Sequence, residues 1–302
     1  MKVAEYKVIT DPKYGFKRID PVPTDEELRK HYYDTYYSLV SDNRGVSMKR
    51  LLERDTETQL EINWLEQTVY TDIEHILRTN LAEESRSLLE VGCGTGDFLA
   101  YLSDRGWDCE GVEPSQEATE YIVKEKGIRI QHCFFEDFVA DCPEAHKKYD
   151  VILLMNVLEH VPRPDEFLNM TKKVLKPSSG IVCIKIPNDF SRFQELAEQV
   201  IDEKKWWVQV PDHINYFDFS SIELFLNKMG FHIIEKVADF PMEFFLLSGD
   251  NYINKPDVGS ACHKKRRRFE MSIPGDLRRS LYVSLAQIGV GRECTVFASY
   301  RE

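Results

Sequence analysis

Short apolar runs alternate with helix-like stretches through the middle of the chain. The apolar runs predict five strands, at 87–91, 108–112, 129–133, 149–155 and 180–186. The stretches between them predict helices at 96–105, 115–126 and 165–175. Strands that alternate with helices indicate a mostly parallel, doubly wound sheet, in which ligands bind beyond the carboxyl ends of the strands.

The pattern changes on either side of this core. Residues 1–85 are mostly polar and helical in pattern, with Thr24 as an N-cap and a helix over about 56–80. After Pro187 the sequence predicts helices at 191–204 and 220–229, and strands at 231–238 and 293–300. We therefore expect four parts: a helical N-terminal cap at 1–85, a core at 86–240, an insertion at 240–290 and a last strand at 291–302.

A glycine-rich turn follows the first core strand. The strand ends at Glu90 and Val91, and the turn reads Gly92-Cys93-Gly94-Thr95-Gly96. Glycine accepts a positive φ and has no Cβ to obstruct a ligand. A second acidic residue, Glu113, closes the next strand, where a carboxylate is placed to accept hydrogen bonds from a ribose diol.

The spacing of this turn argues against a dinucleotide. A dinucleotide turn reads GxGxxG and holds a pyrophosphate, whereas here the third glycine comes one residue early and Glu90 would repel the phosphates. The same carboxylate suits the cationic amino-acid end of S-adenosylmethionine. A nicotinamide-dependent oxidoreductase is therefore disfavoured.

Three segments carry a resemblance to a known family. The turn at 92–96 with Glu113 resembles motif I of the class I S-adenosylmethionine-dependent methyltransferases. The stretch 150–161 resembles the family's fourth strand and following loop, and 175–177 resembles the end of its next helix. The resemblance covers about 86–240. It implies a Rossmann-like α/β fold, with a seven-stranded, mostly parallel sheet whose last strand is antiparallel.

The resemblance also implies the cofactor, S-adenosyl-L-methionine, whose product is S-adenosyl-L-homocysteine, and the residues that hold it. The turn and Glu90 would hold the methionine end, Glu113 and Pro114 the ribose, and Phe134 or Phe135 the adenine. Met155 and Asn156, at the end of the fourth strand, would lie beside the cofactor and the methyl-transfer cavity. The expected cofactor residues are thus Glu90, Gly92, Cys93, Gly94, Thr95, Gly96, Glu113, Pro114, Phe134, Phe135, Met155 and Asn156.

Histidine is the usual proton acceptor near neutral pH, and two histidines fall beside the expected cofactor site. The stretch from Asp212 and His213 to Asp218 resembles the acidic-His-x-x-Tyr-Phe segment of sugar methyltransferases. We therefore expect His213 as the general base, oriented by Asp212, although Val210 replaces a tyrosine of those relatives. His160 is a second catalytic candidate, with loop shaping as its alternative role.

The acceptor is predicted less sharply. The basic run 263–268 is either a solvated loop face or a phosphate-binding segment, because arginine suits bidentate phosphate recognition. Aromatic side chains either stack on an acceptor or seal the cap. The expected acceptor residues are Tyr33, Tyr37, Asn156, Tyr216, Arg266 and Arg267. We favour O-methylation of a sugar, sugar-phosphate or nucleotide-sugar. A quinone or phenol O-methyltransferase and a catalytically silent, cofactor-binding regulatory protein are the alternatives.

The composition of the chain argues against several classes of binding partner. The net charge of −12 over 302 residues argues against nucleic-acid binding. The seven cysteines are scattered without a CxxC pair, which fits a reducing cytoplasm and predicts no metal site. No apolar run has transmembrane length, so we expect a cytoplasmic protein without a membrane partner. The oligomeric state stays open.

Overall fold

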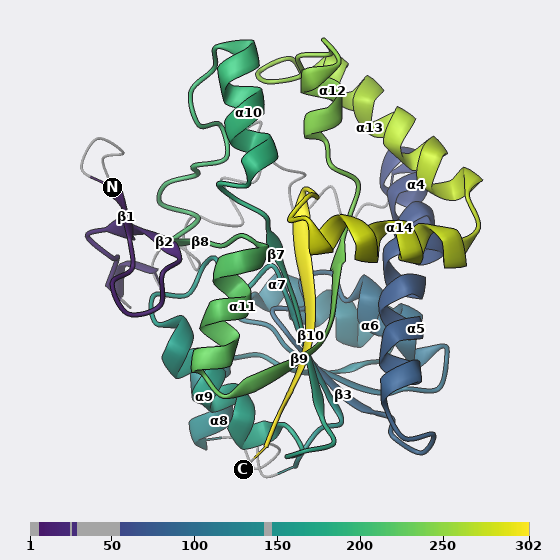
Figure 1. Cartoon of the computed structure of the whole chain (residues 1–302). Helices are drawn as coiled ribbons and strands as arrows, with labels where there is room; N and C mark the ends of the chain where they lie inside the picture. Colours follow the sequence, from purple (N-terminus) through teal and green to yellow (C-terminus); the bar gives the residue numbers. More distant parts are fainter. Residues whose placement is uncertain (1–5, 25, 29–54, 142–146, 302) are drawn as a thin grey trace. The chain divides into compact units, whose positions relative to one another are not determined.

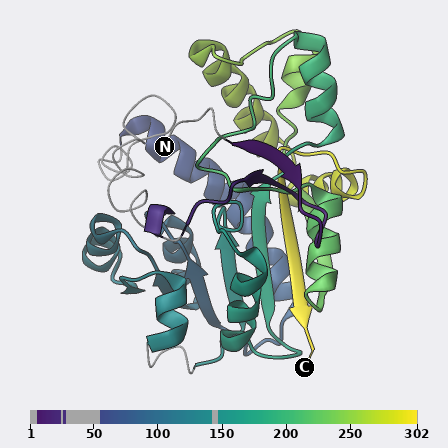
Figure 2. The same ribbon diagram turned by 90° about the vertical axis from the view of Figure 1, so that its left-hand side faces the viewer.

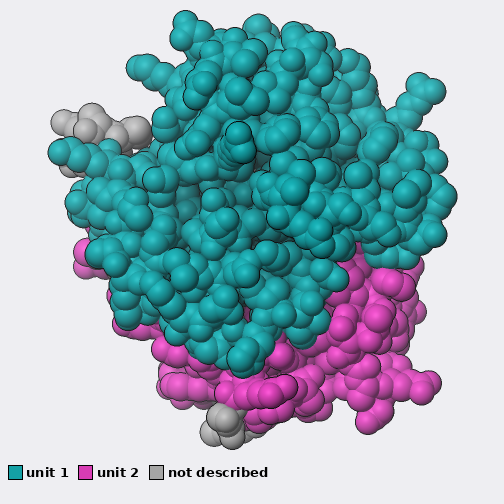
Figure 3. All heavy atoms as spheres, in the orientation of Figure 1, with its two compact units in different colours: residues 1–22, 156–161, 184–298 teal, residues 23–155, 162–183, 299–302 magenta. Residues whose placement is uncertain are grey.

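The computed structural model describes residues 6–24, 26–28, 55–141 and 147–301 (Figure 1). The chain divides into two compact units (Figure 3). The first contains residues 1–22, 156–161 and 184–298, and the second contains 23–155, 162–183 and 299–302. Tyr33 and Tyr37, two of the expected acceptor residues, lie outside the described residues.

The main sheet has seven strands in the order β5-β4-β3-β6-β7-β10-β9, with one antiparallel end. The strands are β3 (Ser87–Val91), β4 (Asp108–Val112), β5 (Arg129–Gln131), β6 (Val151–Met155), β7 (Ile181–Pro187), β9 (Phe231–Ala238) and β10 (Glu293–Tyr300). The expected Rossmann-like α/β fold and its strands are confirmed. Because β3 is parallel to both β4 and β6, the segments after these three strands leave the sheet at the same edge.

Burial explains why these runs form central strands. Strands covered by helices on both faces carry continuous apolar sequence. Leu88 and Leu89 of β3 are fully buried, as are the four residues 151–154 of β6. In the second unit the helices are α4 (Thr56–Leu65), α5 (Thr71–Asn80), α6 (Asp97–Ser103), α7 (Gln116–Tyr121), α8 (Phe135–Asp141) and α9 (Pro164–Val174), with π-helical turns η3 (Glu66–Tyr70) and η4 (Ile122–Lys126).

The first unit begins with a small sheet where a helical cap was expected. Strands β1 (Lys7–Thr10), β2 (Lys17–Asp20) and β8 (Asn215–Tyr216) pair in the order β1-β2-β8 (Figure 2). The Asp11 carboxylate starts the turn by accepting the backbone N–H groups of Lys13 and Tyr14. Phe16 packs on Phe217, with ring centroids 4.6 Å apart. This contact buries the apolar ring of Phe16 and stabilises the hairpin. Because Phe16 and Phe217 are far apart in the sequence, a local pattern could not predict the contact.

The expected insertion is helical. The helices of the first unit are α10 (Arg192–Ile201), α11 (Phe219–Lys228), α12 (Glu243–Leu247), α13 (Pro256–Ser272) and α14 (Gly275–Gln287). Helix α14 packs against β9, and α10 packs against α12. In the part of the chain that the model describes, no helix combines the length and the apolar character that crossing a bilayer requires.

The basic run lies in α13 rather than in a loop. Arg266 points inward, where its guanidinium donates to Asp239 at 2.9 Å and to Glu270 at 3.2 Å. The Tyr282 hydroxyl donates to the other oxygen of Glu270 at 2.5 Å. Arg267 is half-buried. The placement of Arg266 differs from the expected acceptor contact, because its guanidinium is committed to ion pairs inside the unit.

This network makes Arg266 a stability residue. Removing one partner of a buried ion pair leaves an uncompensated charge, so Arg266→Ala should lower the free energy of unfolding by ~3–5 kcal/mol. Urea denaturation measures this change. The exposed neighbour Arg268 provides the control, and Arg268→Ala should change stability by less than ~0.5 kcal/mol. An Arg266→Ala protein with unchanged stability but weakened binding of a phosphorylated acceptor would restore the phosphate-binding role.

Candidate active site

The glycine-rich turn after β3 has the backbone that the sequence predicts. Gly92, Gly94 and Gly96 have φ values of 68°, 55° and 66°. A Cβ at Gly96 would also lie 2.9 Å from Ile122, which excludes a larger side chain. A Cβ at Gly94 would meet nothing within 4 Å, so only the left-handed backbone requires glycine there. The turn therefore presents bare backbone beyond the strand ends.

Glu113 is held firmly at the end of β4. Its Oε2 accepts the Gly94 N–H at 2.9 Å, and its Oε1 accepts the Ser115 N–H at 2.8 Å. The side chain is 1% exposed. Each carboxylate oxygen has a second lone pair, so the fixed group can still accept hydroxyl hydrogen bonds. These contacts fit the ribose-binding role that the sequence predicts.

Glu90 is a buried carboxyl group with one oxygen that lacks a hydrogen bond within the described chain. It is 4% exposed, and its Oε2 has no hydrogen-bond partner among the described residues. Burial, together with the negative charges of Asp97 and Glu113, raises the pKa of Glu90 to about 8. A cationic ligand group would satisfy this oxygen and favour the ionised form. The site thus fits the ammonium group of S-adenosylmethionine.

Asp97 is a site residue that the sequence analysis missed. Its Oδ2 accepts the Thr95 hydroxyl at 2.6 Å, and its Oδ1 pairs with Lys126 Nζ at 2.5 Å. Asp97 is the first residue of α6 and directly follows Gly96. Its position next to the glycine-rich turn could have identified it as a site residue from the sequence. Asp97 orders the Thr95 side chain and adds negative charge beside Glu90.

Other expected cofactor residues divide into half-buried and interior positions. Cys93 is buried, and its Sγ would lie 2.8 Å from a Cβ at Gly111, so the thiol packs inside the unit. Phe135 is 3% exposed and packs on Phe167 with centroids 4.9 Å apart, whereas Phe134 is half-buried. The Pro114 carbonyl lies 3.1 Å from His132 Nε2. Phe135 therefore belongs to the core, and Phe134 stays the predicted adenine neighbour.

A second cluster lies in the first unit, on the segment that continues β6. Asn156 follows Met155 directly, has a φ of 56° and donates its N–H to the Lys185 carbonyl at 2.7 Å. Asn215 clamps the rest of this segment. Its side-chain nitrogen donates to the carbonyls of Leu158 at 2.8 Å and Val161 at 2.7 Å. Asn215 was not predicted, because its partners lie more than fifty positions away.

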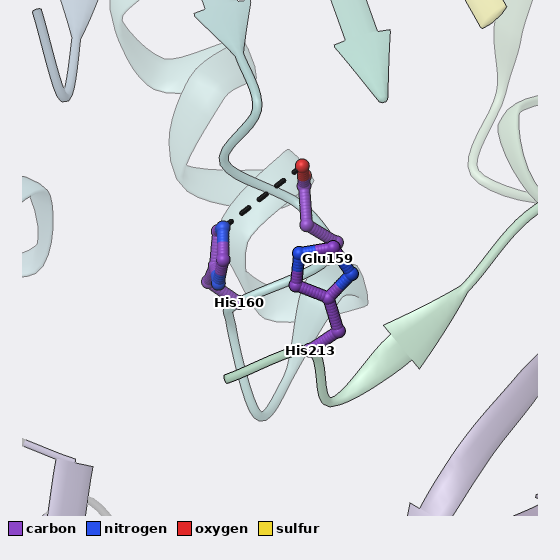
Figure 4. A group of neighbouring side chains, drawn as sticks. All are labelled: Glu159, His160 and His213. Atoms are coloured by element: carbon purple, nitrogen blue, oxygen red, sulfur yellow. Dashed lines mark ion pairs between the residues drawn. The ribbon is translucent and has the colours of Figure 1, made fainter. Parts of the chain in front are cut away.

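This clamp brings Glu159, His160 and His213 together (Figure 4). The two imidazole rings meet edge to face with centroids 4.9 Å apart. His160 Nδ1 lies 2.7 Å from the Asp212 carbonyl, which can only accept, so this nitrogen is the donor. Its Nε2 then faces Glu159 Oε1 at 3.9 Å. Both predicted catalytic histidines therefore lie in one cluster.

Asp189 faces His213 in addition to the predicted Asp212, whose negative charge favours the protonated form of the His213 ring. The Asp189 Oδ2 lies 4.0 Å from His213 Nδ1, while Asp212 contributes its backbone carbonyl to His160. Burial and the neighbouring His160 ring lower the pKa of His213 to about 3, so the ring is neutral at pH 7. Tyr216 is 1% exposed and donates its hydroxyl to the His213 carbonyl at 3.0 Å. Tyr216 thus supports His213 from the interior instead of facing an acceptor.

The same cluster has metal-ligand geometry. One donor atom from each of Glu159, His160 and His213 lies within 4.8 Å of the others. Burial raises the pKa of Glu159 to about 8, and its Oε2 has no hydrogen-bond partner among the described residues. A carboxylate and two imidazoles can hold a divalent cation. Spacing along the sequence predicted no metal, because His213 lies far from the other two residues.

The raised pKa of Glu90 makes cofactor binding pH-dependent. Below pH 8 a proton has to leave Glu90 before it can pair with an ammonium group. The association constant for S-adenosylmethionine should therefore rise with pH, by up to ~10-fold per unit between about pH 6 and 7.5. Titration calorimetry measures this slope. Glu90→Gln should bind more weakly and lose the slope; a slope that persists in this variant would place the titrating group elsewhere.

Glu113 should contribute strongly to cofactor affinity. Glu113→Ala removes the predicted ribose acceptor and two hydrogen bonds that fix the turn. Affinity for S-adenosylmethionine should fall by at least ~10-fold, the loss expected for one charge-assisted hydrogen bond. Calorimetry should show unchanged affinity for Glu117→Ala, an exposed glutamate nearby on α7. If Glu113→Ala bound as tightly as the wild-type protein, Glu113 would have no role in cofactor binding.

Comparison with known proteins agrees with this geometry. Residues 65–236 match the family model described as "Methyltransferase domain". A ubiquinone biosynthesis O-methyltransferase from Psychrobacter arcticus is 29% identical over 136 residues, which cover 41% of this chain and 51% of that protein. One from Actinobacillus pleuropneumoniae is 35% identical over 98 residues, covering 30% and 42%. The chain thus spans about half the length of the curated relatives it matches.

Solved structures support the fold. A SAM-dependent methyltransferase from Archaeoglobus fulgidus aligns with a TM-score of 0.50 and 15% identity, covering 81% of this chain and 99% of that one. The plantazolicin methyltransferase BpumL, in complex with a substrate analogue and SAH, aligns with a TM-score of 0.52 and 15% identity, covering 91% and 94%. The family match spans more than half of the chain, and with the glycine turn it shows that this chain belongs to the methyltransferase-domain family of S-adenosylmethionine-dependent enzymes.

Proposed function

We propose that the protein transfers a methyl group from S-adenosylmethionine to a hydroxyl group of a small molecule, with His213 as the general base. The observation that carries this proposal is the His213 imidazole, which packs on His160 and whose Nδ1 lies 4.0 Å from the Asp189 carboxylate. A hydroxyl acceptor needs such a group, because its own pKa lies far above neutral.

The proposal gives a role to each neighbour of His213. The bound cofactor supplies an activated methyl group, and the protein has to orient the acceptor and remove its proton. With Nδ1 toward Asp189, His213 can accept the hydroxyl proton at Nε2. The Asp189 carboxylate, 4.0 Å from Nδ1 and not hydrogen-bonded to it, would then stabilise the imidazolium through its charge. His160 and Tyr216 hold the ring and its backbone in place.

A phenolic or quinol hydroxyl is the acceptor class with the better support. The curated relatives are named ubiquinone biosynthesis O-methyltransferases, although the matches span about half of their length. The sugar acceptor depends on sequence resemblance, chiefly that of 212–218 to sugar methyltransferases. A phosphorylated sugar is less well supported as the acceptor, because Arg266 forms ion pairs with Asp239 and Glu270. If the protein is instead a catalytically silent, cofactor-binding regulator, replacing His213 should leave its regulatory role unchanged.

The test of this proposal is His213→Ala. Turnover should fall by roughly 10²–10⁴-fold, the usual contribution of general-base catalysis, while the affinity for S-adenosylmethionine is retained. A catechol assayed with methyl-labelled cofactor gives turnover, and calorimetry gives affinity. His232→Ala, an exposed histidine on β9, provides the control. A His213→Ala enzyme as active as the control would move the base to another residue.

Dialysis against EDTA separates this role from metal binding. A base that acts alone needs no cation, so turnover should survive dialysis. Loss of turnover that is restored by Mg²⁺ or Zn²⁺ would instead assign Glu159, His160 and His213 to a cation.

A further inference from the structure

A row of buried polar side chains continues from His213 away from Glu159 and His160. We call Asp189, Arg292 and Glu243 the polar row. Asp189 follows β7, Arg292 directly precedes β10, and Glu243 opens α12. Arg292 Nη1 lies 3.8 Å from Asp189 Oδ1, and the opposite oxygen of Asp189 lies 4.0 Å from His213. The row therefore starts at the proposed base.

The far end of the row lacks partners. Glu243 is fully buried, and neither of its carboxylate oxygens has a hydrogen-bond partner within the described ranges. Arg292 Nη1 is also buried without one. Buried polar atoms are nearly always hydrogen-bonded, because an unpaired one keeps the full cost of its lost hydration. Glu243 and Arg292, whose charges act on each other, thus hold three atoms without hydrogen bonds, which points to a partner from outside the described residues.

The charges of the row indicate the kind of partner. The Asp189 carboxylate pairs with the Arg292 guanidinium, whose charge also acts on Glu243, and the nearby Lys185 and Glu293 form an ion pair with each other. Burial raises the pKa of Glu243, and it raises that of Asp189 to about 6. Burial opposes the charge on Arg292, but Glu243 and Asp189 outweigh it and raise the pKa of the guanidinium. With both acids ionised the row carries one excess negative charge, which a cationic ligand would neutralise.

The surroundings of Glu243 suit an organic cation. Tyr252 lies close enough for the Glu243 charge, together with burial, to raise the pKa of its phenol. An aromatic ring beside a carboxylate is a favourable setting for an ammonium group. The Arg292 side chain is 28% exposed although its Nη1 is buried, so the row reaches the surface of the first unit at this residue.

We propose that the polar row binds a protonated amine carried by the methyl acceptor. Glu243 pairs with the ammonium group, Arg292 donates to a neighbouring acceptor atom of the same molecule, and the hydroxyl to be methylated lies at His213. This inference depends on the proposed hydroxyl methylation for its orientation, but the amine site itself does not. The acceptor would then be an amine-bearing phenol or an amino sugar rather than a neutral quinol.

Matched ligands test the charge preference. The protein saturated with S-adenosylhomocysteine is titrated by calorimetry with dopamine, 4-ethylcatechol and 3-(3,4-dihydroxyphenyl)propionate. These three share a catechol ring and differ in the charge of the chain. Glucosamine and glucose provide the same comparison on a sugar. In at least one scaffold the amine should bind roughly 10- to 100-fold more tightly than its neutral counterpart, the factor that one charge-assisted hydrogen bond provides. Equal binding in both scaffolds would overturn the proposal.

Variants assign the preference to Glu243. Glu243→Gln should remove the preference for the amine, while Glu195→Gln, which removes an exposed carboxylate from α10, should keep it. Stability gives a second readout that needs no ligand. An internal ion pair would make Glu243→Gln less stable, whereas a carboxylate reserved for a ligand leaves the melting temperature unchanged or raises it. A lower melting temperature would assign Glu243 to a structural pair with Arg292 and overturn the proposal.

Methyl transfer measured on the same ligands separates the two proposals. Selective binding of an amine that is lost in Glu243→Gln, without any methyl transfer to these ligands, would retain the amine site and reject the proposed reaction on them. Methyl transfer with equal efficiency to charged and neutral catechols would retain the reaction and reject the amine site.

Discussion

A buried carboxylate needs a partner, and three glutamates in the part of the chain that the structure describes have oxygens without a hydrogen bond. Glu90, Glu159 and Glu243 are each at most 4% exposed, and each has at least one oxygen without a hydrogen-bond partner among the described residues. A fold gains nothing from such groups unless something else pairs with them. They mark the expected cofactor end, the histidine cluster and the far end of the polar row. The candidate sites thus coincide with buried carboxylates whose oxygens have no hydrogen bond among the described residues.

Local sequence was sufficient to predict the strands and the glycine turn at the expected cofactor site. Apolar runs buried on both faces predicted β3, β4 and β6, and the glycine turn with Glu90 and Glu113 needed only residues within one βαβ unit. Asp189, Arg292 and Asn215 could not be found in this way, because each acts through partners that the fold brings together from distant positions. His213 was predicted together with its sequence neighbour Asp212, whose charge acts on the ring, but the spatial neighbour Asp189 was missed.

Two regions show where a local pattern misleads. The stretch 7–20 has too few apolar residues to indicate a sheet, yet Phe16 makes the hairpin by packing on Phe217. The run 263–268 indicates a solvated loop by composition, yet a helix turns Arg266 toward two acids and leaves its neighbour Arg268 exposed. In both cases the deciding energy is a tertiary contact, and propensity only sets a weak preference.

The Asn215 clamp has a consequence for how this scaffold can diversify. Glu159, His160 and His213 are held by hydrogen bonds from 157–161 and 209–216, which lie outside the segment 240–290. Changes in the length of helices α13 and α14 should therefore affect these bonds less than changes in the two segments that make them. In the proposed enzyme, the segment that selects the acceptor could therefore change in evolution at a different rate from the residues that remove the acceptor's proton.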